Sequence, residues 1–241
     1  MAITPDTLRK LAQFDTPTIC NVIELFDVRP RNQGFMGAQI KCNFPDLPPM
    51  VGFASTAAFR SGAPAPKADA YGTLEQQLEN FADLPGPAVV VFQDLDDPPV
   101  GATFGEVMCS TYKGFGSAGL ITSGGGRDLQ QVKALDYPVF TGSTICSHAF
   151  CHILHVGMPV RVGGLAVSQG DLLHGDANGV TNLPSDIAGE VADIAPEFVA
   201  AERLILDYVV SDGPKSPARI TELRGEFGAV IANLIQRIRR S

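Results

Sequence analysis

Short apolar runs alternate with helix-like segments through the middle of the chain. The apolar runs are VGFASTAAF (51–59), PAVVVF (87–92), GLI (119–121) and PVFT (138–141). The segments between them are helix-like at 70–81, 106–113 and 127–135, and the first of these has Leu74, Leu78 and Phe81 at helical spacing. Strands interleaved with short helices predict an α/β domain rather than separate all-α and all-β parts.

Two further helices are predicted before the first strand. Thr4 and Pro5 have the arrangement of an N-cap followed by the first helical residue, and Thr16 and Pro17 repeat it. Residues 28–50 have no regular pattern apart from a predicted strand at Met36–Lys41.

The C-terminal third has a different texture. Short β segments are predicted between 159 and 184, and they are separated by the turn pairs Gly163-Gly164, Gly170-Asp171 and Asn178-Gly179. Ser185 then caps a long amphipathic stretch that Pro196 interrupts, and a last helix follows Ser216. We therefore expect one domain over residues 1–241, with a helical extension at 1–30 and C-terminal helices at 185–241.

The acidic composition limits the expected partners. The 241 residues have a net charge of −8 and a pI of about 4.9, which argues against a nucleic-acid surface. No apolar run approaches the roughly 18 residues that span a bilayer, so no membrane partner is expected. The first residues lack a secretory signal, and the five cysteines lack C-x-x-C spacing. Reduced thiols in a cytoplasmic protein are the resulting expectation.

The segment GLITSGGGRDLQQV (119–132) combines three glycines with an Arg–Asp pair. If 119–121 is a strand and Arg127 opens a helix, Gly124–Gly126 form the turn between them, and bare backbone N–H groups can bind an anion there. Arg127 adds a planar fork suited to a carboxylate, and Asp128 could hold a divalent metal. The alternative is that Asp128 only complements the helix dipole while Arg127 pairs on the surface.

A second turn resembles the first. In GATFGEVMCSTYKG, Gly105 and Glu106 stand at another predicted helix start. Two helix N-termini on neighbouring strands can point into one crevice, where ligands of α/β sheets commonly bind. Simple capping by Gly105 and Glu106 is the alternative.

The ordered succession of motifs resembles a known family. GEVM, GSAGLITSGGGRD, PVF and VGGLAVSQGDLLHGDANGV are similar to the family named for the regulator of ribonuclease activity A. That family also contains the class II 4-hydroxy-4-methyl-2-oxoglutarate (4-carboxy-4-hydroxy-2-oxoadipate) aldolases. The resemblance covers roughly residues 16–200. It implies a layered α/β fold of the swivelling β/β/α type, assembled as a homotrimer or homohexamer with active sites between subunits.

The aldolase pattern implies a role for each matching residue. Gly105, Glu106, Val107 and Met108 would form the loop that holds pyruvate, and Glu106 would orient a water as the base. Arg127 would contact the keto and carboxylate oxygens of a small anionic keto acid, and Asp128 would hold Mg²⁺ or Mn²⁺. Two residues depart from the family pattern, because Ser123 stands where Asp or Asn is common and Gly126 where an apolar residue is usual.

The reaction implied by the resemblance is metal-dependent retro-aldol cleavage of a 4-hydroxy-2-oxo acid to pyruvate. The same enolate chemistry would permit oxaloacetate decarboxylation. The rival interpretation is a non-catalytic regulator that binds a ribonuclease, and a third is a relative acting on another keto acid or sugar acid. A lysine Schiff base is not favoured, since nothing around Lys113 or Lys133 marks a desolvated amine.

The histidines and the C-terminal acids leave alternatives open. His148, His152 and His155 have H-x3-H-x2-H spacing, which on a helix would align them for zinc, whereas packing or an interface is the other interpretation; His174 follows further on. In related aldolases a Glu from a neighbouring subunit helps to bind the waters of the metal. Glu197 or Glu202 could occupy that position, or both could be solvated helix residues.

Overall fold

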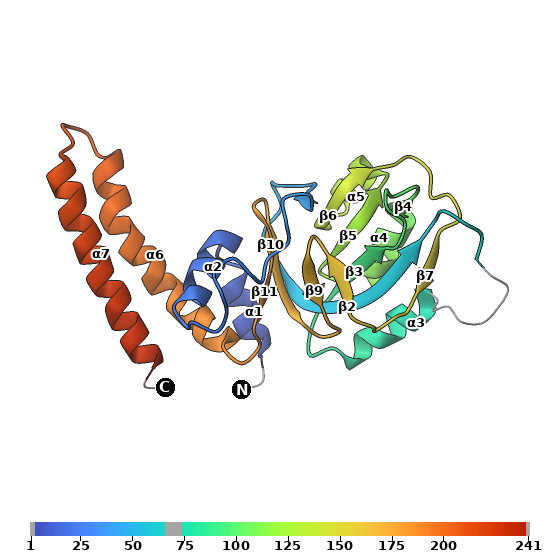
Figure 1. Cartoon of the computed structure of the whole chain (residues 1–241), viewed down its shortest axis with the longest axis horizontal. Helices are drawn as coiled ribbons and strands as arrows, with labels where there is room; N and C mark the ends of the chain where they lie inside the picture. The colour runs from blue at the N-terminus through green and yellow to red at the C-terminus, as the bar shows by residue number, and fades with distance from the viewer. Residues whose placement is uncertain (1–2, 66–73, 240–241) are drawn as a thin grey trace.

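The computed structural model describes residues 3–65 and 74–239, and its centre is a mixed β-sheet (Figure 1). The strands of the sheet run in the order β1-β6-β5-β3-β2-β10-β11, with β4 beside β5 and β7 beside β2. Their bounds are β1 Lys41–Cys42, β2 Met50–Arg60, β3 Ala88–Asp94, β4 Ala102–Phe104, β5 Gly119–Gly126, β6 Val139–Thr144, β7 His152–Leu154, β10 Leu172–Asp176 and β11 Gly179–Leu183. The central strands β2, β3, β5 and β6 are parallel, and β4 is parallel to β5.

The parallel strands are apolar on both faces because both faces are covered. Helices α3 (Leu74–Glu79), α4 (Glu106–Gly114) and α5 (Leu129–Ala134), with the 3-10 turn η1 (Asn80–Asp83), contribute to the core on one face. On the other face lies the hairpin of β8 (Val160–Val162) and β9 (Leu165–Val167), together with Met36 and Ile40. The expected α/β layering is therefore confirmed.

The N-terminal helices form a third core with the C-terminal ones. Helices α1 (Pro5–Leu11) and α2 (Thr16–Glu24) pack with α6 (Ala188–Val210) against the β10–β11 side of the sheet. Thr4 caps α1 as predicted, since its hydroxyl accepts a bond from the N–H of Thr7. The cap of α2 is instead Asp15, whose carboxylate accepts from the N–H of Thr18, so the predicted cap at Thr16 is wrong by one residue.

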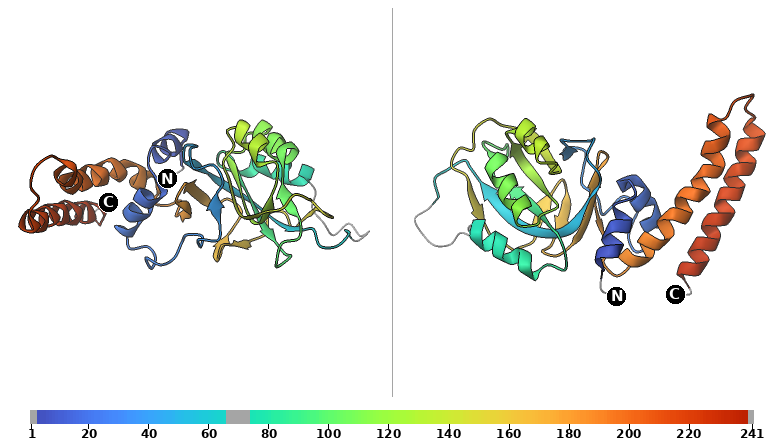
Figure 2. Two further views of the ribbon diagram at one scale, coloured as in Figure 1. Left: turned by 90° about the horizontal axis from the view of Figure 1, so that it is seen from above. Right: turned by 180° about the vertical axis from the view of Figure 1, so that it is seen from behind.

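Helix α6 and helix α7 (Pro217–Ile238) form a hairpin that extends away from the sheet (Figure 2). The predicted cap of α6 at Ser185 is wrong, because Ile187 is the N-cap, and α6 does not break at Pro196. Proline removes one backbone hydrogen bond, but Ile194, Ala195 and Phe198 around it are buried, so packing holds the helix together. No helix within the described ranges is long and apolar enough to cross a membrane.

The remaining predictions differ in their outcome. The strands predicted at 51–59, 87–92 and 138–141 are confirmed within a few residues, as is the helix at 106–113. The strand expected at Met36–Lys41 is wrong, because residues 37–40 form a turn and β1 begins at Lys41. The first four residues of the helix predicted at 70–81 lie outside the described residues. The grouping of the whole chain into one domain stays a prediction.

Candidate functional site

The three glycines at 124–126 belong to strand β5 and are not the predicted turn. Strand β4 packs closely beside them. A Cβ atom on Gly124 would lie 2.5 Å from Asp94 Oδ2 and 2.6 Å from Thr103 Cγ2, and one on Gly126 would collide with the ring of Phe104. Glycine is therefore needed at these positions because side chains of other strands lie directly against the backbone of β5.

The turn lies one step later, at Arg127 and Asp128. Asp128 has a left-handed φ of 54°, which Asp tolerates better than most residues, and α5 begins only at Leu129. The expectation that Arg127 opens the helix is therefore wrong. Asp128 makes no side-chain hydrogen bond to its own helix. The backbone thus directs its carboxylate elsewhere.

The Asp128 carboxylate instead reaches the start of α4. Its Oδ2 accepts a hydrogen bond of 3.1 Å from the backbone N–H of Glu106 and lies 3.8 Å from Arg127 Nε. A Cβ atom on Gly105 would lie 2.6 Å from the same oxygen and 3.0 Å from Arg127 Nε. The end of β5 and the start of α4 thus meet at one point, although the two bonded residues are 22 positions apart in the sequence.

The meeting point leaves hydrogen-bonding capacity for a ligand. The Arg127 and Asp128 side chains are 34% and 38% exposed. Within the described part of the chain, no hydrogen bond uses the Arg127 Nη atoms or Asp128 Oδ1. The capping alternative is partly right, since Asp128 does cap a helix, but that helix is the neighbouring α4.

The other residues of the predicted loop separate into two groups. Glu106 and Val107 are exposed, Val107 to 79%, whereas the side chain of Met108 packs against the core under α4. The side chain of Met108 is therefore partly buried, unlike those of its two neighbours. The structure thus brings together Gly105, Glu106, Arg127 and Asp128, and it turns Met108 inward.

The donor set at this point fits a hard cation and not zinc. Asp128 and the exposed Glu106 offer carboxylate oxygens, and Mg²⁺ commonly uses one or two protein carboxylates and keeps several waters. Among residues 3–65 and 74–239 there is no group of three His, Cys, Asp or Glu side chains arranged to hold a metal.

The histidine motif does not form a helix, so the zinc interpretation of its spacing is wrong. Residues 146–151 are a loop, His152 starts β7, and His155 has a left-handed φ of 50°. The ring of His148 bonds its Nδ1 to the carbonyl of Ala149. His174 is buried in β10, far along the chain from the others.

Asp94 is a titratable residue that the sequence reasoning missed. It ends β3, its Oδ1 accepts the N–H of Asp96, and its Oδ2 is buried with no hydrogen-bond partner among described residues. Burial raises the pKa of Asp94 to about 6. With Asp96, Ser123 and Ser143 it lines a cavity of 520 Å³ at the ends of the parallel strands. An acidic residue at the end of a buried apolar strand was the available signal.

The lysines lack the surroundings of a Schiff-base amine, and the C-terminal acids lie on the helix α6. Lys133 pairs with Asp46 at 3.2 Å and Lys113 donates to the carbonyl of Leu135, and both lysines are exposed, so neither is a desolvated amine. Glu197 makes two hydrogen bonds to Arg237 of α7, of 2.7 and 2.8 Å. Glu202 is partly buried, and burial raises its pKa.

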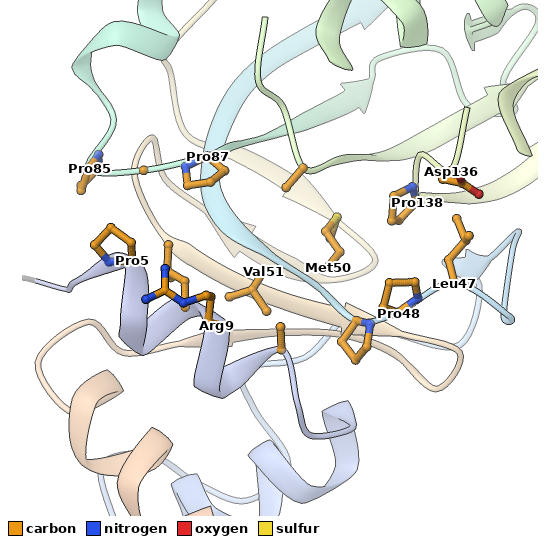
Figure 3. Close-up of a pocket in the computed structure, with 15 residues that line it drawn as sticks. Pro5, Arg9, Leu47, Pro48, Met50, Val51, Pro85, Pro87, Asp136 and Pro138 are labelled. Atoms are coloured by element: carbon orange, nitrogen blue, oxygen red, sulfur yellow. The ribbon is translucent and has the colours of Figure 1, made fainter. Parts of the chain in front are cut away.

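A larger groove of 740 Å³ lies at the opposite edge of the sheet, where the parallel strands begin (Figure 3). Pro5, Pro48, Pro85, Pro87 and Pro138 line much of it. Its charged members Arg9 and Asp136 are far fewer than its apolar ones. Size alone therefore does not make it the reactive site.

Comparisons with known proteins agree with this architecture. A protein of Pseudomonas syringae pv. tomato has a solved structure that superposes with a TM-score of 0.71 at 20% identity, covering 93% of this chain and 95% of the other. RraAS2 of Streptomyces coelicolor, described as an unusual member of the RNase ES inhibitor RraA protein family, superposes with a TM-score of 0.66 at 22% identity, covering 83% and 95%. These likenesses show the fold.

Sequence comparison gives the family. A Halalkalibacterium halodurans protein provisionally named 4-hydroxy-4-methyl-2-oxoglutarate aldolase is 33% identical over 132 residues, which are 53% of this chain and 62% of that protein. The chain matches less than two thirds of the length of each of its curated relatives. The model of the RraA-like family, described as Aldolase/RraA, matches residues 16–181, and the chain therefore belongs to this family.

Proposed function

We propose that this protein is a divalent-metal-dependent aldolase that cleaves a 4-hydroxy-2-oxo acid to pyruvate. The observation that carries the proposal is the meeting of the Asp128 carboxylate, the Arg127 side chain and the first turn of α4 around Gly105. A carboxylate next to a guanidinium and a helix N-terminus suits a ligand that brings both a cation and an organic acid. The name of the relative in H. halodurans supports the same substrate class.

The groups of this chain would divide the work as follows. The free Nη atoms of Arg127 would bind the carboxylate and keto oxygens, and the unpaired N–H groups at the start of α4 would bind the same acid. Asp128, with Glu106 nearby, would hold Mg²⁺ or Mn²⁺. Bound there, the metal would supply Lewis-acid stabilisation of the negative charge that develops on the keto oxygen.

The bond changes balance without a further reactant. A carboxylate oxygen of Glu106, directly or through a water, would accept the proton of the 4-hydroxyl group. The bond between carbons 3 and 4 then breaks, and carbon 4 becomes a carbonyl carbon. The electron pair of the broken bond stays with carbon 3 and forms the enolate of pyruvate beside Arg127. Return of the proton to carbon 3 completes pyruvate. The same enolate would form from oxaloacetate after loss of carbon dioxide.

The test is a coupled pyruvate assay over 4-hydroxy-2-oxo acids and oxaloacetate, with Mg²⁺ and with EDTA. Asp128→Asn is expected to lower kcat/KM by about a thousandfold, because removing one charge-stabilising group commonly has an effect of this size. Asp136→Asn is the matched control, since Asp136 also has a left-handed φ, of 48°, and is exposed at the other edge of the sheet. Its activity should be unchanged.

Full activity of Asp128→Asn, or equal activity in EDTA, would contradict the proposal. No pyruvate from any substrate, together with tight binding to a ribonuclease, would favour the non-catalytic regulator. Assembly as a homotrimer or homohexamer stays a prediction, and analytical ultracentrifugation would check it.

A further inference from the structure

A second polar cavity lies away from the candidate aldolase site. It has a volume of 480 Å³ and lies between the segment 29–35 and the β8–β9 hairpin. Arg29, Gln33, Phe35, Arg161 and Asn182 are among the residues that line it. The hairpin covers the face of the sheet opposite α4 and α5, so this cavity is separate from the Asp128 carboxylate.

Arg29 is held rigidly in one wall of this cavity. Its Nη1 donates to the backbone carbonyl of Asn182 at 3.1 Å and also to the side chain of Asn182, and its Nη2 donates to Thr181 Oγ1 at 3.2 Å. A Cβ atom on Gly34 would collide with the guanidinium, so the bare backbone of Gly34 lies directly against it. The side chain is partly buried, and this burial lowers the pKa of Arg29.

The positive charges here have no negative partner among the residues that the structure describes. None of the ion pairs between described residues includes Arg29 or Arg161, whereas nearby Arg31 is paired with Glu24 at 3.4 Å. Of these two guanidinium groups, that of Arg29 is partly buried and that of Arg161 is exposed. A partly buried charge usually has a partner, so the arrangement calls for an anion from outside.

We propose that this cavity binds a small oxyanion, a carboxylate or a phosphate group, between Arg29 and Arg161. The hydrogen bonds to Asn182 and Thr181 fix the guanidinium of Arg29 in advance, which reduces the entropy lost on binding. Arg161 lies on the hairpin, where its backbone N–H donates to Gln93 Oε1 at 2.8 Å and fixes that strand. The amide of Gln33 and the ring of Phe35, 47% exposed, line the space for the rest of the ligand. The volume suits a small molecule and not a macromolecule.

The experiment titrates the purified full-length protein with inorganic phosphate and, separately, with malonate, at constant ionic strength held with chloride. Binding is followed by calorimetry and by amide chemical shifts. We expect one site whose shifts centre on residues 33–35 and 161–166, and the stronger of the two probes identifies the source of the oxyanion. Arg161→Gln should weaken binding at least tenfold, whereas Arg224→Gln, the same charge change on exposed α7, should not.

Arg161→Gln is the deciding variant, because Arg29→Gln also removes bonds that join the segment 29–35 to β11. Wild-type affinity in Arg161→Gln, or no binding of either probe, would overturn the proposal. The proposal would also be overturned if the shifts were confined to residues 105–108 and 127–129 and were abolished by Arg127→Gln. The anion would then bind at the candidate aldolase site. That result would leave the proposed function intact, so the two proposals fail separately.

Discussion

At the edge where the parallel strands begin, the buried side chains of His174 and Asp176 bond to Thr16, whereas at the edge where they end Asp94 Oδ2 and Ser143 Oγ have no hydrogen-bond partner among the described residues. His174 is fully buried beside the start of β2, and its Nδ1 bonds Thr16 Oγ1 at 2.9 Å while its Nε2 bonds the carbonyl of Leu11 at 3.2 Å. Asp176 accepts the N–H of Thr16 at 2.9 Å. These bonds join the N-terminal helices to the sheet.

The opposite edge has different properties. Asp94 Oδ2 and Ser143 Oγ are buried without hydrogen-bond partners in the described ranges, whereas a left-handed Asp occurs at both edges, Asp128 here and Asp136 at the other. Unpaired buried polar groups and strained residues lower stability by roughly 1–3 kcal/mol each, and they concentrate at functional sites. Side-chain hydrogen bonds at the first edge therefore hold the N-terminal helices to the sheet, whereas the second edge has the unpaired acid and hydroxyl next to the proposed site.

The largest expected effect tests the stabilising edge. His174→Ala would leave a cavity and remove the partners of Thr16 and the Leu11 carbonyl, so we expect the free energy of unfolding to fall by about 3 kcal/mol. Urea denaturation measures it, with the exposed His148→Ala as control, for which the change should stay under about 0.5 kcal/mol. A loss of pyruvate release by the folded His174→Ala protein would contradict a purely stabilising role for this edge.

The same variant should also change how stability depends on pH. Burial lowers the pKa of His174 below its ordinary 6.5, so the unfolded chain takes up the proton first as the pH falls. Wild-type stability should therefore decrease below about pH 6.5, and His174→Ala should lack this part of the decrease. Denaturation curves at pH 5 and pH 7.5 would measure the difference.

A smaller effect is expected at Gly105, on the ligand-binding edge. The backbone of Gly105 is extended, so alanine fits it, but the new methyl group would push against Asp128 Oδ2 and Arg127 Nε. We expect turnover to fall about 100-fold, since small misplacements of reacting groups have effects of this size, with little loss of stability. Gly114→Ala, at the other end of α4 with open space around it, is the control. Equal turnover in both variants would contradict the site.

The smallest expected effect concerns Asp94. Its pKa of about 6 in the folded protein exceeds the ordinary 3.8, so the folded state binds the proton more tightly. The stability from this group is present below about pH 4 and is lost as the pH rises through 6. Asp94→Asn should remove that loss, and urea denaturation between pH 4 and pH 7.5 would detect it. An unchanged slope would mean that Asp94 is not the unpaired acid of this edge.

Local patterns predicted the strands well but not the geometry of the site. The run PAVVVF predicted β3 because both faces of a central parallel strand are apolar. Three glycines after GLI indicated a turn, since nothing local reveals that Phe104 and Thr103 of β4 pack against them. The bond from Glu106 to Asp128 joins residues 22 positions apart, so the sequence named both residues without giving the contact.

The same kind of limit explains the failed zinc interpretation. The spacing of His148, His152 and His155 implies a common face only on a helix, and Ala149 and His155 both have a left-handed backbone that a helix forbids. The break predicted at Pro196 was wrong for the opposite reason, because tertiary packing on both sides of this residue outweighs one missing hydrogen bond and the helix continues.

The bond between Asp128 and the N–H of Glu106 has a consequence for any acid that approaches Gly105. Whatever draws Oδ2 away must give that amide a replacement acceptor, and an incoming carboxylate brings one. Binding of such an acid would therefore replace one hydrogen-bond acceptor with another. The N-terminus of α4 would stay capped in both states, by Asp128 before binding and by the ligand carboxylate after it.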